Sequence, residues 1–85
     1  MKINKLDKVF KSKNIKNRTL AKCLKKSEET ISKWRNNKRQ PSLENLYEIA
    51  RLLRVNIQDL IEPTDWKNDK SETYEEFVKR MKKEE

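Results

Sequence analysis

The chain has 85 residues, of which 33% are hydrophobic and 42% are charged, so it can build one small core and little more. It contains no Gly and no His, which excludes a glycine-rich phosphate loop and a histidine-based metal or catalytic site. The single cysteine excludes an internal disulfide, and no apolar run is long enough to span a bilayer. We therefore expect a cytoplasmic protein with no metal, no cofactor, no membrane contact and no catalytic activity.

The formal net charge of +8 is distributed unevenly along the chain. Residues 1–41 hold 14 Lys and Arg against 3 Asp and Glu, whereas residues 42–85 hold 8 against 11. A basic half beside a nearly neutral half is typical of a protein that meets an anionic partner on one face. Compositional drift toward Lys, Asn and Ile is the alternative, but drift does not explain why Lys gathers in one half.

In the first half of the chain, apolar residues recur at helical spacing in three stretches, which predicts three short helices. Asn14 follows the first stretch and Asn36–Asn37 follows the third, and Asn accepts the left-handed conformation in which many helices end. Ser27 is a good N-cap for the third helix, whose first turn holds Glu28 and Glu29, where the helix dipole favours anions. The three apolar stripes are, in chain order, Ile3, Leu6 and Phe10, then Leu20, Ala21 and Leu24, then Ile31 and Trp34.

The second half predicts a fourth helix capped by Ser42 and a short fifth helix between its cap, Asn56, and Pro63. Residues 64–70 are polar apart from one Trp and form a predicted linker, after which Ser71 is expected to cap a last, amphipathic helix. The apolar faces are Leu43, Leu46, Ala50 and Leu53 with Tyr47 and Ile49 at the border, then Ile57, Leu60 and Ile61, then Tyr74, Phe77, Val78 and Met81.

Residues 17–36 carry the functional pattern, because two helices joined by a break of about three residues are typical of a helix-turn-helix. Ala21 lets the two helices cross closely, and Ile31 and Trp34 pin the second helix to the core. The opposite face of that helix then points outward, where it fits the major groove of DNA. The residues of this outward face are Glu28, Glu29, Thr30, Ser32 and Lys33.

Over about residues 3–62 the sequence resembles the Xre/Cro family of phage-repressor-like helix-turn-helix proteins. The residues that carry the resemblance are Leu20-Ala21, Ser27, Thr30 to Trp34, Asn36 to Leu43, Leu46 to Ala50, Leu53, Val55 and Asp59 to Ile61. The resemblance implies an all-α fold with a five-helix repressor-like DNA-binding domain over residues 1–62. Residues 63–85 would add a short linker and an extra C-terminal amphipathic helix for dimerisation or partner contact.

The resemblance also implies roles for individual residues. The outward face would read bases, principally through Glu28, Glu29 and Lys33 with Thr30 and Ser32 beside them, and the DNA backbone would be held by neighbouring residues. Lys25 departs from the family, which usually has Gly in this turn, so either the turn is wider or a positive φ costs about 1–2 kcal/mol. Two further departures are Lys16 in place of a hydroxyl cap and Arg35 in place of a frequent Glu. The expected backbone contacts are Lys16, Asn17, Arg18, Ser27, Asn36, Lys38 and Arg39.

These features predict a sequence-specific regulator of transcription, most simply a repressor, that binds double-stranded DNA as a homodimer on an inverted repeat. Two alternatives stay open: a sequence-blind DNA coater, and a protein-interaction module such as an antitoxin whose tail binds a protein partner. The tail either folds back on the domain with Trp66 or pairs with a second chain. The expected dimer or tail contacts are Ile57, Leu60, Ile61, Trp66, Tyr74, Phe77, Val78 and Met81.

Glu28 and Glu29 either accept hydrogen bonds from cytosine or merely stabilise the start of their helix. Cys23 is expected to fill the edge of the core. Five lysines near the N-terminus are expected to form a solvated face rather than a second binding surface: Lys2, Lys5, Lys8, Lys11 and Lys13.

Overall fold

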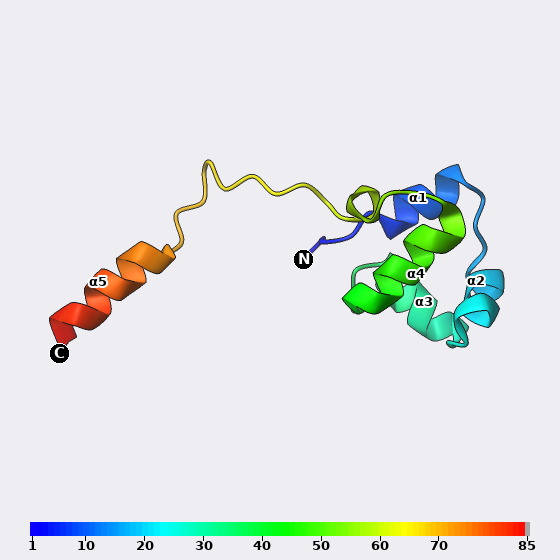
Figure 1. The fold of residues 1–85 in the computed structure, drawn as a ribbon, viewed down its shortest axis with the longest axis horizontal. Coiled ribbons are helices and arrows are strands. Elements are labelled where there is room, and N and C mark those ends of the chain that lie inside the picture. The colour runs from blue at the N-terminus through cyan, green and yellow to red at the C-terminus, as the bar shows by residue number, and fades with distance from the viewer. Residues whose placement is uncertain (85) are drawn as a thin grey trace.

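The structure is a computed structural model that describes residues 1–84. Four α-helices and one 3-10 turn pack together, and a fifth α-helix follows a linker (Figure 1). The packed elements are α1 (Leu6–Ser12), α2 (Asn17–Leu24), α3 (Glu28–Arg35), α4 (Leu43–Leu53) and η1 (Ile57–Leu60), and the separate helix is α5 (Tyr74–Glu84). Residues 1–84 hold no strand beyond the isolated antiparallel bridge between Asn4 and Ile61, so the predicted all-α fold is confirmed.

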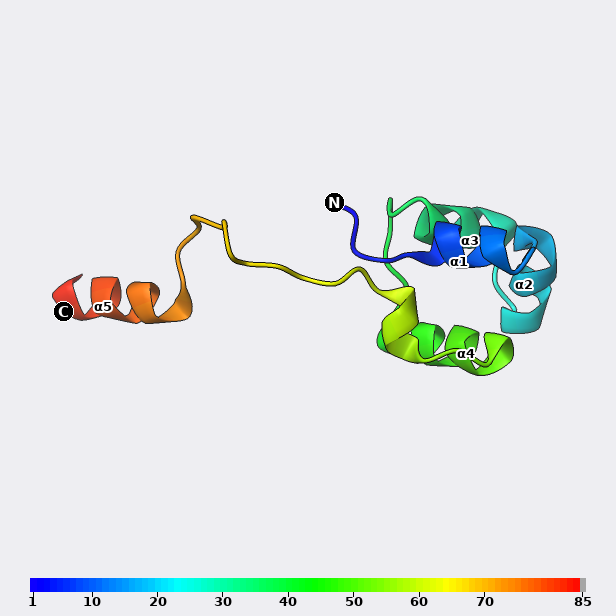
Figure 2. The ribbon, with the colours of Figure 1, turned by 90° about the horizontal axis from the view of Figure 1, so that it is seen from above.

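The two views of the ribbon agree that the linker carries α5 away from the packed helices (Figures 1 and 2). The molecule accordingly extends 55 Å along its longest axis and only 23 and 20 Å along the others. None of the helices in residues 1–84 combines the length and the apolar character that crossing a membrane requires. Of the two alternatives left open for the tail, its return onto the domain is not the arrangement found.

Side-chain caps begin several of the helices as predicted. The Ser27 hydroxyl accepts from the backbone N–H of Thr30 (3.1 Å) at α3, and Ser42 caps α4 in the same way. Asn56 caps η1, which is a single 3-10 turn rather than an α-helix. The cap expected at α5 was wrong by two residues: Thr73 accepts from the backbone N–H of Glu76 (3.2 Å), whereas the Ser71 side chain donates to Asp69.

Four helix ends use a left-handed residue although the chain has no Gly. At each of them the next residue donates its backbone N–H to the carbonyl five positions back, which closes the end of the helix. Lys25 has φ 56° and ψ 44°, so α2 and α3 are joined by the tight turn and not by a wider one. The four left-handed residues are Asn14, Lys25, Asn37 and Arg54.

The core is formed by one apolar face from each packed element. Ile49, expected at the border of α4, is fully buried, whereas Leu43 is 70% exposed because it lies in the first turn, beyond the edge of the core. Ile3 and Cys23 are exposed as well, contrary to expectation. The buried apolar residues are Leu6, Phe10, Leu20, Ala21, Ile31, Trp34, Leu46, Ile49, Ala50 and Leu60.

The N-terminal segment is pinned to the end of α3 by a polar network that the sequence analysis did not predict. Asn4 is 2% exposed, and its side-chain Nδ2 donates to the Trp34 carbonyl and to Gln40 Oε1, both at 2.8 Å. The Asn37 side chain accepts from the backbone N–H groups of Ile3 (2.8 Å) and Asn4 (2.9 Å). The network fixes the position of α3 and of the loop that follows it.

Candidate nucleic-acid interface

The orientation of α3 is set by its buried face. Ile31 is fully buried and Trp34 is 4% exposed, and both pack in the core with Ala21 of α2. A helix of this length cannot turn once two of its side chains are fixed in a core, so the opposite face is held toward solvent. Glu28 and Lys33 are exposed on that face, as a helix that enters a groove requires.

The outward face of α3 also makes contacts within the helix. Glu29 forms an ion pair with Lys33 (3.2 Å), one turn further along. The Thr30 hydroxyl lies 2.9 Å from the Ser27 hydroxyl, and the side chain of Ser32 accepts from Asn36 Nδ2 at 3.4 Å. Thr30 and Ser32 are only half-exposed, so the side chains most open to a ligand are those of Glu28, Glu29 and Lys33.

The N-terminus of α2 lacks the caps that begin α3 and α4. Lys16 occupies the cap position with an extended backbone and no side-chain hydrogen bond, and the first turn holds no acidic residue. The leading backbone N–H groups of α2 therefore remain available to an anion, with the helix dipole favouring one. Lys16 and Arg18 are exposed beside them. With Lys16 in place of the family's hydroxyl cap, the N-terminus of α2 is thus well suited to bind a phosphate.

Arg35 links three helices through its guanidinium group. Its Nε donates to Asp7 Oδ1 of α1 (2.6 Å), its Nη1 donates to Asn17 Oδ1 of α2 (2.9 Å), and the group lies 5.5 Å from the centre of the Phe10 ring. Hydrogen bonds from Arg35 and then Lys11 hold the pKa of Asp7 below its ordinary value. Because Asn17 Oδ1 accepts from Arg35, the orientation of the amide is fixed, and Nδ2 and the backbone N–H of Asn17 are the groups that can donate to a phosphate.

In the sequence, Arg35 is recognisable as a departure from the family pattern, whereas its partner, Asp7, is not. A basic residue where the family often has an acid is a signal for a compensating acid on a neighbouring helix. Asp7 lies in the first predicted helix, four residues after Ile3, and is the acid that could be paired with Arg35.

The loop after α3 divides its residues between two directions. Asn36, Lys38 and Arg39 are exposed, whereas Asn37 is half-buried and turned toward the N-terminal segment. Lys38 and Arg39 both donate their backbone N–H to the Lys33 carbonyl, at 2.9 and 3.2 Å. The loop is therefore anchored at its base while its charged side chains remain free to reach an anion.

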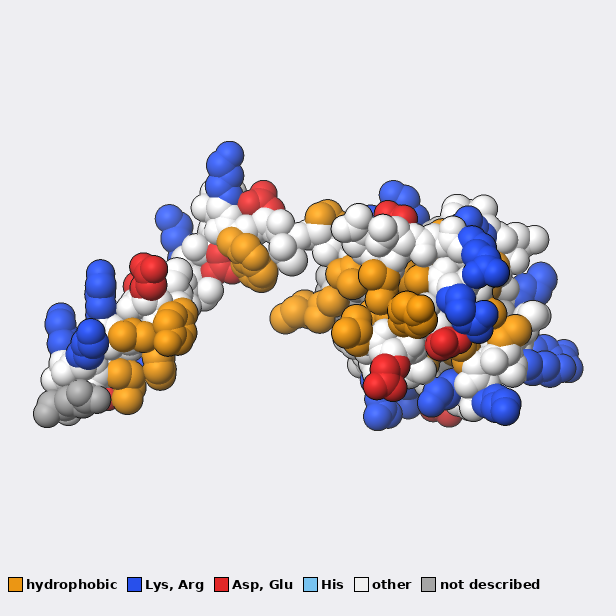
Figure 3. Space-filling model, viewed as in Figure 1, with side chains coloured by type: hydrophobic (Ala, Val, Ile, Leu, Met, Phe, Trp, Pro, Cys, Tyr) orange, Lys and Arg blue, Asp and Glu red, His pale blue; other side chains and the backbone are white. Residues whose placement is uncertain are grey.

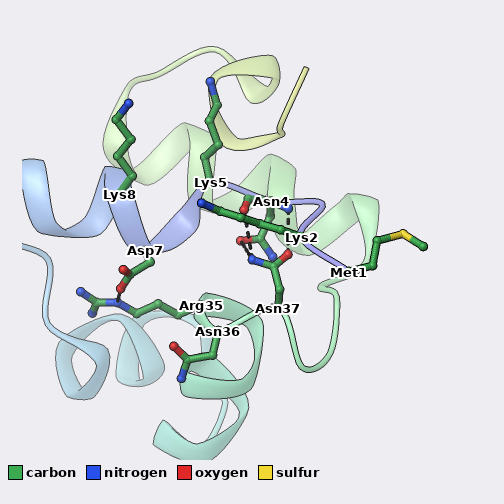
Figure 4. A pocket seen from close by; sticks show the side chains of 9 residues that line it. All are labelled: Met1, Lys2, Asn4, Lys5, Asp7, Lys8, Arg35, Asn36 and Asn37. Carbon is green, nitrogen blue, oxygen red and sulfur yellow. Dashed lines mark hydrogen bonds and ion pairs between the residues drawn. The ribbon is translucent and has the colours of Figure 1, made fainter. Parts of the chain in front are cut away.

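A polar cleft of about 370 Å³ opens between the N-terminal segment and the end of α3 (Figure 4). In the figure Lys2, Lys5 and Lys8 lie on one side, and Arg35 and Asn36 lie on the other. Three of the lysines expected to form a solvated face thus border a cleft that is continuous with Asn36. Within residues 1–84, no three His, Cys, Asp or Glu side chains are grouped as metal ligands would be.

The residues expected to contact a second chain or the tail differ in their access to solvent. Leu60 is fully buried in the core and is not available to a partner, which corrects that expectation. Ile57 and Ile61 are half-buried against the core. The tail residues remain exposed to solvent: Trp66 is 70% exposed and Tyr74 is 81% exposed. Phe77, Val78 and Met81 lie on one stripe of α5.

Comparison with known proteins agrees with this geometry. A crystal structure of a protein from Bacteroides fragilis, named a "putative DNA-binding protein", superposes with a TM-score of 0.69 at 45% identity. The match covers 73% of this chain and 100% of that one. No curated protein matches the chain. Residues 5–66 match the family described as the Cro/C1-type helix-turn-helix DNA-binding domain, and the chain therefore belongs to that family.

Proposed function

We propose that the protein is a sequence-specific regulator of transcription, acting as a repressor that binds an inverted repeat as a homodimer. The observation that carries the proposal is the exposed face of α3, held outward by Ile31 and Trp34 and flanked by cationic groups. One copy presents one such helix, and a two-fold repeat requires two. Occupancy of the site would block polymerase.

In this proposal backbone contacts place the protein and base contacts give it specificity. The uncapped N-terminus of α2, with Lys16 and Arg18, takes one phosphate group, and Lys38 with Arg39 grips the same backbone beyond α3. Each of these cations releases a counterion from DNA, so affinity falls as salt rises. Asn17, Ser27 and Asn36 add neutral contacts at the same two places.

The acidic residues at the start of α3 have two opposed effects. Glu28 and Glu29 are repelled by phosphate, yet a carboxylate accepts well from the N4 amino group of cytosine. Glu29 already pairs with Lys33 in the free protein (3.2 Å), which supports its role in stabilising the helix. We assign cytosine reading to Glu28 first, and Lys33 would contact a base only after leaving its pair with Glu29.

Selection from a random pool of DNA duplexes at physiological salt tests the proposal. We expect an enriched inverted repeat with half-sites about one helical turn apart. Glu28→Gln should relax the preferred base at one position, with a loss of about 1–3 kcal/mol in discrimination. A pool without an enriched sequence would contradict specific regulation and favour a sequence-blind DNA coater.

Salt titration separates the two kinds of contact. Lys38→Ala should weaken binding to all sequences alike and lower the slope of log affinity against log salt by about 1. Lys83→Ala in α5 is the matched control and should leave the slope unchanged. Equal slopes for both variants would remove the loop from the interface.

A protein partner for the tail is a second candidate function. The observation that favours it is the exposed apolar stripe of α5, which buries none of its described residues. In this case α5 would gain protection from hydrogen exchange only when a toxin-like partner is present, and selection from the DNA pool would be weak.

A further inference from the structure

Two apolar helix faces have no partner among the described residues. On α4, Leu43 is 70% exposed and Tyr47 is 63% exposed, and the two lie one turn apart on the outward face. On α5, Tyr74 is 81% exposed and Met81 is 40% exposed. Figure 3 shows one apolar patch over α4 and another along α5, on the same side of the molecule. The two helices are both 11 residues long.

The charges beside the two faces run in the same order. On α4, Glu44 precedes Arg51 by seven residues, and on α5, Glu75 precedes Lys82 by seven. Seven residues are close to two helical turns, so each acid and its base lie on the same edge of their apolar stripe. All four side chains belong to exposed residues.

This order selects one direction of pairing between the helices. In an antiparallel pair, Glu44 faces Lys82 and Arg51 faces Glu75, so both contacts join opposite charges. In a parallel pair, the two charged edges would lie on opposite sides of the contact, so neither acid would meet a base. Arg51 is bound by Glu48 in the free chain (2.8 Å), which keeps its guanidinium at this edge.

The apolar side chains match in the same register. Leu43 falls opposite Met81, and Tyr47 falls opposite Phe77 and Val78. Tyr74 then meets a groove of about 360 Å³ between α4 and η1. The groove is lined by Tyr47, Ala50, Arg51, Arg54, Val55 and Ile57.

We propose that α5 of one copy docks antiparallel on α4 of a second copy, so that two chains exchange their C-terminal helices. A second copy is favoured over the same chain because the linker runs outward and α5 makes no return (Figures 1 and 2). An isolated helix of 11 residues is marginal in water, so α5 requires a surface to pack on. The 12 residues from Glu62 to Thr73 span at most about 40 Å, enough to reach a neighbour.

The proposal rests on the homodimer of the proposed function and names the surface that would form it. Reciprocal docking uses each apolar face once and closes the assembly at two chains. It also explains why a domain that is packed on itself carries a detached helix. The two recognition helices would thereby be tied together without any contact from α3.

Two charge-reversed variants of the full chain test the docking. The tail variant is Glu75→Lys with Lys82→Glu, and the face variant is Glu44→Lys with Arg51→Glu. Each variant alone opposes like charges, so we expect monomers in sedimentation velocity where the unaltered chain dimerises, with at least a tenfold weaker association. In an equimolar mixture, each tail meets a matching face, and we expect heterodimers.

The control is Glu76→Lys with Lys83→Glu, which reverses the same charges at the same spacing on the opposite side of α5. It should dimerise like the unaltered chain. A monomeric mixture, or a face or tail variant that dimerises alone, would overturn the proposal. An unaltered chain that stays monomeric while α5 is protected from hydrogen exchange would show docking within one chain and would overturn it too.

The DNA function is tested separately on a duplex that holds one half-site. None of the reversed residues belongs to the proposed DNA interface, so all variants should bind the half-site equally. A variant that loses the dimer and still binds the half-site would show that the two functions are separate, because only the docking of α5 is affected. Normal dimers without half-site binding would instead contradict the proposed function.

Discussion

The packed helices and α5 have similar local signals and very different surroundings. Thr73 caps α5 much as Ser27 caps α3, and Arg80 pairs with Glu72 in the tail (3.1 Å) as Lys33 pairs with Glu29 in the domain (3.2 Å). Yet the domain buries ten apolar side chains in one core, and α5 buries none of its described residues. Caps and ion pairs along a helix define where a helix forms, whereas contacts across the chain decide whether it belongs to a domain.

The domain has polar contacts between distant segments, and residues 63–84 of the tail have none. The Asn4 and Asn37 side chains join residues 30 or more positions apart, and Arg35 joins α1, α2 and α3. Among the described tail residues, side-chain hydrogen bonds reach at most from Glu72 to Arg80. The contrast predicts that substitutions in the domain act on folding and that matched substitutions in the tail do not.

The largest effect is expected from the two phenylalanines. Phe10 is fully buried, so Phe10→Ala should lower the free energy of unfolding by about 3–5 kcal/mol, through lost burial and the cavity left behind. Phe77 is 43% exposed, so Phe77→Ala should change it by less than about 0.5 kcal/mol. Urea unfolding, followed at a concentration where the chain is monomeric, measures both.

Comparing the unfolding free energies of the two variants tests whether α5 packs on its own domain. Similar losses from Phe10→Ala and Phe77→Ala would mean that α5 packs on its own domain in solution. That result would contradict the arrangement found here.

Asn37 comes next, because its side chain holds the N-terminal segment and its backbone is left-handed with φ 58°. Asn37→Gly keeps the backbone conformation and removes the hydrogen bonds, for an expected loss of about 1–3 kcal/mol. Asn37→Ala should lose about 1 kcal/mol more, because Ala resists this conformation. Thermal unfolding measures both, and Asn68→Ala in the linker is the control that should change nothing. Equal stability of the Gly and Ala variants would contradict the strain argument.

Much of the domain could be predicted from local patterns. The Ser27 and Ser42 caps, the left-handed Asn14, and the buried pair Ile31 and Trp34 all follow from residue type and spacing within about one or two turns. The outward direction of α3 follows from the buried pair in turn. These are features in which neighbours along the chain decide the outcome.

The parts that could not be predicted depend on distant neighbours. Leu43 was expected on the apolar face of α4 and Ile49 at its border, and only the extent of the core decides that Leu43 is exposed and Ile49 is buried. The Asn4–Asn37 network has no local signature, because its partners come from opposite ends of the domain. The pairing of Asp7 with Arg35 is of the same kind.

Lys25 offers a smaller effect with the opposite sign. Its φ of 56° is unfavourable for a residue with a Cβ, so Lys25→Gly should raise the free energy of unfolding by at most about 1 kcal/mol. Lys22→Gly, inside α2, should lower it by a similar amount, because Gly weakens a helix interior. Lys79→Gly in α5 should leave the unfolding of the domain unchanged. Differential scanning calorimetry of the three variants measures these shifts, and a destabilised Lys25→Gly variant would contradict strain at this turn.

The smallest effect concerns acid pH, where a carboxylate in each region can be compared. The pKa of Asp7 is lowered below 3.8 by hydrogen bonds from Arg35 and then Lys11, and the pKa of Asp69 is lowered by its hydrogen bonds from Ser71. Only the Asp7 contacts depend on the domain being folded, because Ser71 is two residues from Asp69 whether the domain is folded or not.

A lowered pKa in the folded state contributes stability above the unfolded value, and that contribution disappears as pH falls through the folded value. The unaltered chain should therefore be more stable than Asp7→Asn at pH 5–7, and the difference should shrink as the pH falls below 3.8. Asp69→Asn should unfold like the unaltered chain at every pH. Urea midpoints measured from pH 7 to pH 3 give all three curves. A pH-independent gap between the unaltered chain and Asp7→Asn would mean that Asp7 stabilises the domain through packing rather than charge, whereas a gap for Asp69→Asn would tie the linker to the folding of the domain.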